Sequence, residues 1–118
     1  TLKCTNNNDK FTKSTTIGNG KLTKMIGQIT SDEVMYAGGA NSNNTKYYLY
    51  SGKWYWTMTP YSFSTSGYAG VSVVENYGRL GSNVVSNPTG GTIRPVVSLK
   101  SDAISGGSGT AASPFLVG

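Results

Sequence analysis

The chain contains no histidine, a single cysteine and only five acidic residues among its 118 residues. Since acid–base and nucleophilic catalysis usually depend on His, Cys or converging carboxylates, these absences remove most conventional catalytic machinery. Cys4 has no histidine to activate it, so we interpret it as an unpaired thiol or as half of a disulfide whose partner lies outside this sequence. The composition therefore predicts no catalytic residue, no metal site, no cofactor and no enzyme.

Long apolar runs and clustered charges are also missing. No run approaches the roughly 18 apolar residues that a membrane-spanning helix needs, and no signal peptide is visible. The net charge is +5, but the lysines are scattered through the first half of the chain, so we expect solvated lysines and no nucleic-acid partner. The chain begins at Thr1 in a polar segment, which indicates the C-terminal part of a longer exported protein.

What the chain has instead is a composition typical of strands and loops. Hydrophobic residues make up 36% of the sequence and charged residues 13%, and much of the remainder is Gly, Ser, Thr and Asn. The length fits one domain with one modest core over residues 1–118. We expect a loop-rich lead-in over 1–21, anchored by Phe11 and Ile17, a core over 22–100, and a terminal hairpin or tail over 101–118.

Helix signals are confined to one short segment. Residues 24–29 suit a buried strand, and Thr30 or Ser31 can then cap a helix whose first turn holds two acids. Gly38 or Gly39 supplies a left-handed exit. Because adjacent helical residues point about 100° apart, Asp32 and Glu33 form a capping arrangement rather than a catalytic pair.

Aromatic and alternating segments predict two hairpins. The first joins residues 47–50 to 54–58 through the polar turn 51–53. Alternation along 54–58 puts Trp54, Trp56 and Met58 on one face and Tyr55 and Thr57 on the other, and one face should be buried. A core stripe is favoured over a carbohydrate-binding platform. The second hairpin joins 68–74 to 79–85 around residues 75–78.

The remaining segments close the fold. Residues 93–99 form a strand in which Pro95, lacking an amide donor, must occupy a strand start, a bulge or an edge. A glycine-rich turn over 105–110 then leads to a short apolar segment over 113–117. This turn lacks the Lys-Ser/Thr ending and the following helix of a phosphate loop. These elements define an α+β, β-rich fold with one or two short helices and antiparallel hairpins.

The order of the motifs carries a resemblance to a known fold family. It comprises a helix beginning Thr30-Ser31-Asp32-Glu33, a Tyr-Trp-x-x-x-Pro pattern from Tyr55 to Pro60, a hairpin around Tyr77-Gly78, the run Ile93-Arg94-Pro95-Val96-Val97-Ser98-Leu99, and a tail with Gly109-Thr110 and Pro114-Phe115. Over residues 22–117 the chain resembles C-type-lectin-like domains of the formylglycine-generating-enzyme type. More narrowly, it resembles C-terminal domains of exported, often prepilin-like, surface proteins of Gram-positive Firmicutes.

This resemblance implies an extracellular location at a bacterial cell surface. The enzymatic activity is not carried over, because Cys4 alone cannot supply the reactive cysteines and metal sites of formylglycine-generating enzymes. Calcium is not predicted either, because the Glu-Pro-Asn and Trp-Asn-Asp patterns of calcium-binding lectins are missing from the chain.

Two functional hypotheses remain open. The first is a non-enzymatic surface domain that binds a glycan or protein ligand through side chains in or beside the predicted turns. These candidate ligand-binding residues are Tyr61, Phe63, Tyr68, Asn76, Tyr77, Asn83 and Asn87. The same residues could instead hold the loops together. The alternative hypothesis is a structural head domain of a pilin-like filament or cell-wall protein that assembles with copies of itself.

Overall fold

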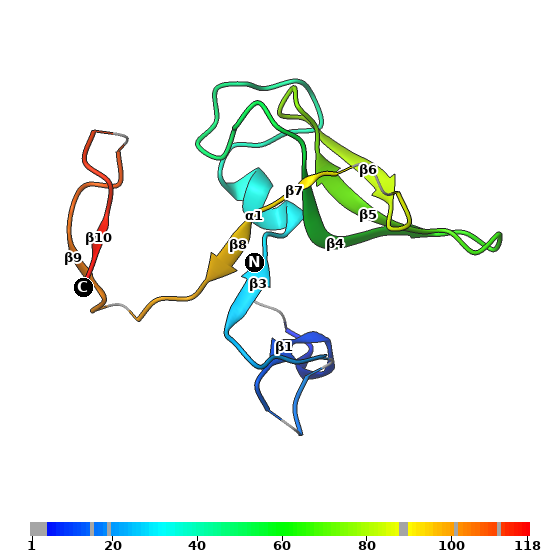
Figure 1. The fold of residues 1–118 in the computed structure, drawn as a ribbon, viewed down its shortest axis with the longest axis horizontal. Coiled ribbons are helices and arrows are strands. Elements are labelled where there is room, and N and C mark those ends of the chain that lie inside the picture. Colours follow the sequence, from blue (N-terminus) through cyan, green and yellow to red (C-terminus); the bar gives the residue numbers. More distant parts are fainter. Residues whose placement is uncertain (1–4, 15, 19, 88–89, 101, 111) are drawn as a thin grey trace.

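A four-stranded sheet forms the centre of the computed structural model, which describes residues 5–14, 16–18, 20–87, 90–100, 102–110 and 112–118 (Figure 1). Its strand order is β6-β5-β4-β7. Strands β4, β5 and β6 form an antiparallel meander, and β7 runs parallel to β4. The bounds are Tyr55–Phe63 for β4, Ala69–Val74 for β5, Leu80–Val84 for β6 and Thr92–Ile93 for β7. Together with one short helix, these strands confirm the α+β, β-rich class.

The predicted hairpin around residues 75–78 is confirmed. The amide of Gly78 donates to the carbonyl of Glu75 at 2.9 Å, and Gly78 has a φ of +76°. The amide of Glu75 donates to the carbonyl of Arg79 at 2.8 Å, which joins β5 to β6. Asn and Gly at these turn positions make the tight reversal possible.

The other predicted hairpin, between 47–50 and 54–58, is wrong. Residues 47–50 form a turn, in which the amide of Tyr50 donates to the carbonyl of Tyr47 at 3.1 Å. Both sides of β4 are already occupied, because Tyr55 pairs with Val74 of β5 and with Thr92 of β7. The aromatic segment 47–50 therefore contributes side chains to the core instead of a strand.

The short helix α1, Ser31–Tyr36, begins and ends as its sequence predicts. The Thr30 hydroxyl accepts a hydrogen bond from the Glu33 amide at 3.2 Å, and the Glu33 carboxylate accepts one from the Thr30 amide at 2.8 Å. This reciprocal pair is a capping box. Gly38 follows with a φ of +99°, and Gly39 donates to the Val34 carbonyl at 2.9 Å. Val34 is the fully buried residue of α1.

Substituting Thr30 by alanine is expected to lower the free energy of unfolding by about 1 kcal/mol, because the Glu33 amide loses its side-chain acceptor. Urea denaturation followed by tryptophan fluorescence measures this change. Thr65→Ala, in the exposed turn between β4 and β5, is the control and should change stability by less than about 0.5 kcal/mol. Equal effects of the two substitutions would contradict the capping role.

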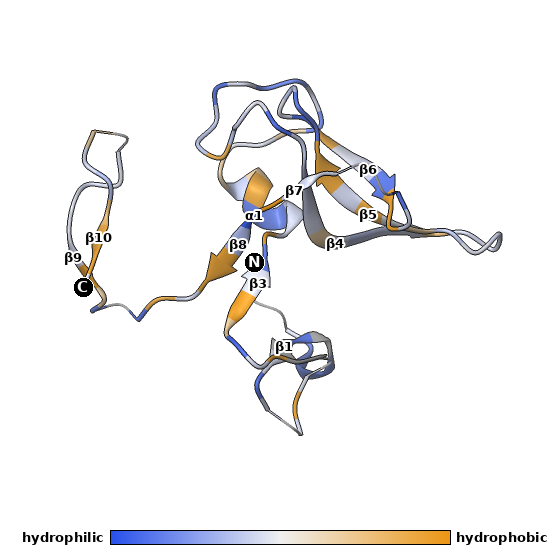
Figure 2. Cartoon of the chain, viewed as in Figure 1, coloured by the Kyte–Doolittle hydropathy of each residue, from blue (hydrophilic) through white to orange (hydrophobic). Residues whose placement is uncertain are grey.

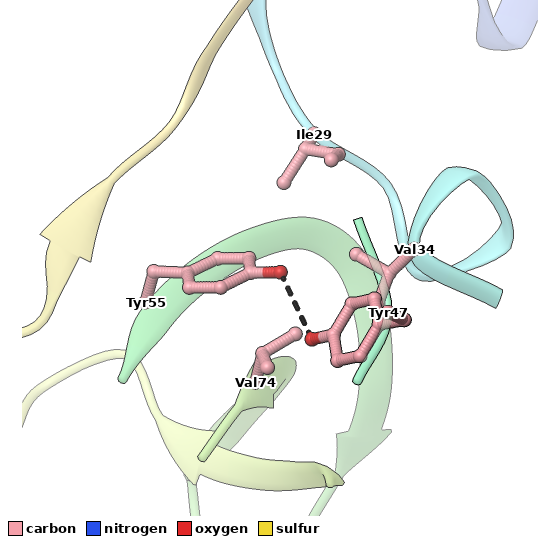
Figure 3. Close-up of a cluster of buried hydrophobic side chains, with 5 residues drawn as sticks. All are labelled: Ile29, Val34, Tyr47, Tyr55 and Val74. Carbon is pink, nitrogen blue, oxygen red and sulfur yellow. Dashed lines mark hydrogen bonds between the residues drawn. The ribbon is translucent and has the colours of Figure 1, made fainter. Parts of the chain in front are cut away.

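The core lies between α1 and the face of the sheet that carries Tyr55 and Thr57. Its buried cluster consists of Ile29, Val34, Tyr47, Tyr55 and Val74 (Figure 3). The hydroxyls of Tyr47 and Tyr55 lie 3.4 Å apart, and the Arg94 guanidinium lies 4.7 Å from the centre of the Tyr55 ring. Burial and the hydrogen bond with Tyr47 raise the pKa of the Tyr55 phenol. The expectation that one face of residues 54–58 is buried is therefore confirmed, and it is the Tyr55 face.

The predicted strand over 24–29 is only partly buried. Strand β3, Ile26–Gln28, pairs antiparallel with β8, Pro95–Val97. Ile29 is buried, but Met25 and Ile26 are each more than half exposed. A two-stranded ladder has no second layer over most of its length, so its apolar residues stay accessible.

The lead-in contains a 3₁₀ turn and two very short strands. These are η1, Asn7–Asp9, β1, Phe11–Thr12, and β2, Gly20–Lys21, with β1 and β2 parallel. Ile17 is 49% exposed, so its predicted anchoring role is wrong. The Phe11 side chain and Cys4 lie outside the described residues.

The closing segment is split into two strands by Arg94. Strand β7 joins the four-stranded sheet and β8 joins β3, and Pro95 begins β8 at a position that suits its missing donor. The carbonyl of Arg94 accepts the Ile29 amide at 3.3 Å. The chain ends in an antiparallel hairpin of β9, Ile104–Gly106, and β10, Leu116–Val117.

Candidate functional site

A polar groove of about 560 Å³ runs between α1 and the core-facing side of β4, β5 and β6. Helix α1 forms one wall, and the second half of β4 forms another. Four of the twelve lining residues are serine or threonine, and the lining also includes one exposed tyrosine and one ion pair. The groove is lined by Ser31, Met35, Asn41, Thr59, Pro60, Tyr61, Ser72, Glu75, Arg79, Leu80, Gly81 and Ser82.

Hydrogen bonds hold the floor of this groove in place. The Thr59 hydroxyl accepts the Ser31 amide at 2.9 Å, which ties the start of α1 to β4. Buried Thr57 donates to the Ser72 carbonyl at 2.6 Å, and Ser72 donates to the Gly81 carbonyl at 3.3 Å. These hydroxyls are already engaged, so they shape the groove more than they offer free contacts.

Other polar groups in the groove remain open to a ligand. Among the described residues, the side chains of Asn41 and Ser82 make no hydrogen bond, and both residues are exposed. Tyr61, in β4, is 65% exposed and also lines the groove. One amide, one hydroxyl and one aromatic ring therefore face solvent around the same cavity.

The charges in the groove balance each other. Arg79 donates from Nε and Nη2 to the two carboxylate oxygens of Glu75, at 3.0 and 2.8 Å. These hydrogen bonds raise the pKa of the Arg79 guanidinium. A Cβ at position 81 would lie 2.5 Å from a Glu75 carboxylate oxygen, so Gly81 gives the Glu75 side chain room over β6. The bidentate geometry fixes both side chains, and the pair adds no net charge.

Only one of the seven predicted ligand-binding residues lines this groove, namely Tyr61. Phe63 and Tyr68 flank the turn at the far end of β4 and β5, and they are 81% and 58% exposed. Asn76 and Tyr77 belong to the turn at the opposite end of β5. The structure therefore does not bring the predicted residues together into one site.

Three of these residues make hydrogen bonds within or between loops, two of them through the main chain and Asn83 through its side chain. The Tyr77 carbonyl accepts the Asn44 amide at 3.1 Å, and the Asn76 carbonyl accepts the Tyr50 hydroxyl at 3.3 Å. The Asn83 side-chain oxygen accepts from the Val84 amide and from the Asn87 side chain, at 2.9 and 3.0 Å. The Asn83 side chain therefore has a structural role that needs no ligand, whereas the contacts of Asn76 and Tyr77 are made by their main-chain carbonyls.

A second groove, of about 320 Å³, lies on the opposite face of the sheet and is mostly apolar. Trp56 pairs with Val73 and with Ile93, so these side chains share the face that points away from the Tyr55 core. The Trp54 and Trp56 rings pack edge to face with their centres 5.1 Å apart. Any side chain at Gly91 would overlap them. The apolar groove is lined by Gln28, Trp56, Thr57, Met58, Val71, Val85 and Ile93.

No local sequence pattern indicates the polar groove. Ser31 has the pattern of a helix cap and Glu75 that of a turn residue, and their convergence depends on how α1 docks on the meander. The i, i+4 spacing of Glu75 and Arg79 across a tight turn is the one local signal of the ion pair.

Comparison of the chain with family models, with curated proteins and with solved structures finds no match. In the described part of the chain, no helix has the length and apolar character needed to cross a membrane. The same residues contain no group of three or more Cys, Asp or Glu side chains placed to hold a metal ion.

Proposed function

We propose that this chain is a non-enzymatic, extracellular recognition domain that binds a glycan in the polar groove between α1 and β4–β6. The observation that carries the proposal is the combination of an exposed Tyr61 ring with the free polar side chains of Asn41 and Ser82 around one cavity. The extracellular, bacterial-surface location and the lectin-like fold rest on the resemblance of the sequence motifs.

The chemistry of the groove suits a polyhydroxylated ligand. A pyranose ring presents an apolar face that stacks on an aromatic side chain, while its hydroxyls exchange hydrogen bonds with amides and hydroxyls. Tyrosine and asparagine supply such contacts with little conformational cost. The Glu75–Arg79 pair leaves the groove without a net charge, so an uncharged sugar is the better match.

A binding role is favoured over catalysis by the state of the acid in the groove. Both Glu75 carboxylate oxygens accept hydrogen bonds from Arg79, and among the residues that the structure describes no second carboxylate lines the cavity. Hydrolysis of a glycosidic bond normally needs two carboxyl groups on either side of the bond.

Replacing Tyr61 by alanine is expected to weaken glycan binding about tenfold, because the stacking surface worth roughly 1.5 kcal/mol is removed. The measurement is binding of the purified, labelled domain to an array of neutral and acidic glycans, mucins and bacterial cell-wall fragments, followed by titration of the best probe. Since Tyr61 is exposed, the variant should unfold at the same urea concentration as the parent.

Tyr48→Ala is the matched control, because Tyr48 is 80% exposed and does not line the groove. Selective binding that is lost with Tyr61→Ala and kept with Tyr48→Ala would support the site. Binding that survives Tyr61→Ala would contradict this location, and silence across the whole array would contradict a glycan ligand and favour a protein partner.

A further inference from the structure

The C-terminal hairpin stands apart from the rest of the described chain. In Figure 1, β9 and β10 lie on the side of the β3–β8 pair that faces away from the four-stranded sheet. Among the described residues, the backbone hydrogen bonds of residues 103–118 all go to partners within residues 100–118. An isolated two-stranded hairpin is at best marginally stable in water, so this hairpin needs a surface to pack against.

The hairpin exposes the apolar side chains that such packing would use. Ile104 and Val117 are directly opposite each other across the two strands, so they share one face, and they are 45% and 59% exposed. Leu116 is 60% exposed, and Figure 2 shows β10 as a strongly hydrophobic segment. Phe115 lies beside Gly109 within the hairpin and is also more than half exposed.

The whole chain exposes far more surface than a closed monomer of its size. Its accessible surface is 8511 Å², whereas a compact monomer of 12.4 kDa is expected to expose about 6,100 Å². The radius of gyration is 16.0 Å, against about 13.5 Å expected for a compact chain of this length. The excess of about 2,400 Å² matches the area that each chain buries in an obligate dimer, roughly 1,000–2,500 Å².

The apolar groove on the outer face of the sheet offers a complementary surface. Trp56, Met58 and Val71 line it, together with exposed Ile93 and Val85, which are 68% and 55% exposed. The hairpin and the groove of one chain therefore each expose an apolar surface to water.

We propose that two copies of the chain form a symmetric dimer in which the β9–β10 hairpin of each copy packs into the apolar groove of the other. Val117 and Ile104 of one copy contact Ile93 and Trp56 of the other, and the same contacts recur across the two-fold axis. Both hairpins and both grooves are then covered, and the assembly is closed. A closed pair of this kind is distinct from an open filament.

A second copy fits better than the hairpin of the same chain. Strand β8 is held antiparallel to β3 and runs away from the four-stranded sheet, so the chain leaves its own groove behind before β9 begins (Figure 1). To reach its own groove, the hairpin would have to double back past the β3–β8 pair. The groove of a second copy can be reached with β8 in its present direction.

The first test is the mass of the purified chain in solution by size-exclusion chromatography with light scattering, over a hundredfold range of concentration. We expect the mass of two chains, and we expect Val117→Glu and Ile93→Glu each to shift the equilibrium to the monomer by at least tenfold. Ile17→Glu, at a half-exposed position of the lead-in, is the control and should leave the dimer intact. A parent chain that is monomeric at every concentration would overturn the proposal.

The second test identifies which surfaces meet. In a Cys4→Ser background, Val117→Cys and Ile93→Cys are made as separate chains and mixed under mild oxidation. A disulfide-linked pair containing one chain of each kind would support the exchange of hairpins, and Val117→Cys mixed with Ile17→Cys should give none. If the double variant with both cysteines closes only an internal disulfide, the hairpin packs on its own groove and the dimer is wrong.

Discussion

Tyr55→Ala is expected to lower the free energy of unfolding by about 3–5 kcal/mol, which is a large part of the stability of a small domain. The Tyr55 side chain is fully buried at the centre of the core, between Val34 of α1, Val74 of β5 and the Tyr47 ring. Its removal leaves a cavity and also takes away the surface over which the Arg94 guanidinium lies at 4.7 Å.

Urea denaturation followed by circular dichroism measures this loss. Tyr55→Phe keeps the ring and removes only the hydroxyl that lies 3.4 Å from the Tyr47 hydroxyl, so it should cost about 1 kcal/mol. Tyr48→Ala, which removes an 80% exposed ring, should have little effect. If Tyr55→Ala and Tyr48→Ala were equally mild, the core would not lie where the structure places it.

Gly78→Ala is expected to cost about 2–3 kcal/mol, the second largest effect. The residue has a φ of +76°, which costs a non-glycine residue roughly 1–2 kcal/mol. A Cβ there would also overlap the Asn44 carbonyl and lie 3.1 Å from the Tyr47 ring. The substitution would therefore push the 41–50 loop away from the β5–β6 turn and disturb the position of Tyr47 in the core.

Gly67→Ala separates these two causes. Gly67 has a φ of +87°, but nothing lies within 4 Å of the Cβ that alanine would add. Gly67→Ala should lose only the roughly 1–2 kcal/mol that the positive φ costs an alanine, in the same urea experiment. A Gly78→Ala variant no less stable than Gly67→Ala would show that the loop does not pack closely on this turn.

Elements whose signals are local could be predicted from the sequence. The capping box needs only Thr30 and Glu33, three residues apart, and the turn before β6 needs only the Asn and Gly within it. The position of Pro95 at the start of β8 is explained by its lack of an amide hydrogen-bond donor. The hydrophobic alternation of residues 54–58 showed correctly that one face is buried, but alternation alone does not identify which face.

Features that depend on distant partners could not be predicted. Residues 47–50 have the aromatic composition that is typical of a strand. They form a turn because the strands that pair with β4 come from residues 69–74 and 92–93. The predicted ligand-binding residues lie apart for a similar reason. Tyr61 and Tyr77 are both exposed tyrosines in or beside a predicted turn. They lie near opposite ends of β5, because the register of the meander places them there.

The split of the closing segment at Arg94 has a consequence for the order of folding. The partner of Ile26 in β3 is Val97, which is synthesised 71 residues later. The partner of Tyr55 in β4 on its β7 side is Thr92, which is synthesised 37 residues later. The β4–β5–β6 meander can pair as it leaves the ribosome, whereas β3 and the outer edge of β4 must wait for residues 92–97. During that delay an unpaired strand edge is exposed, so a nascent chain stalled before residue 92 would be prone to aggregate and to need a chaperone.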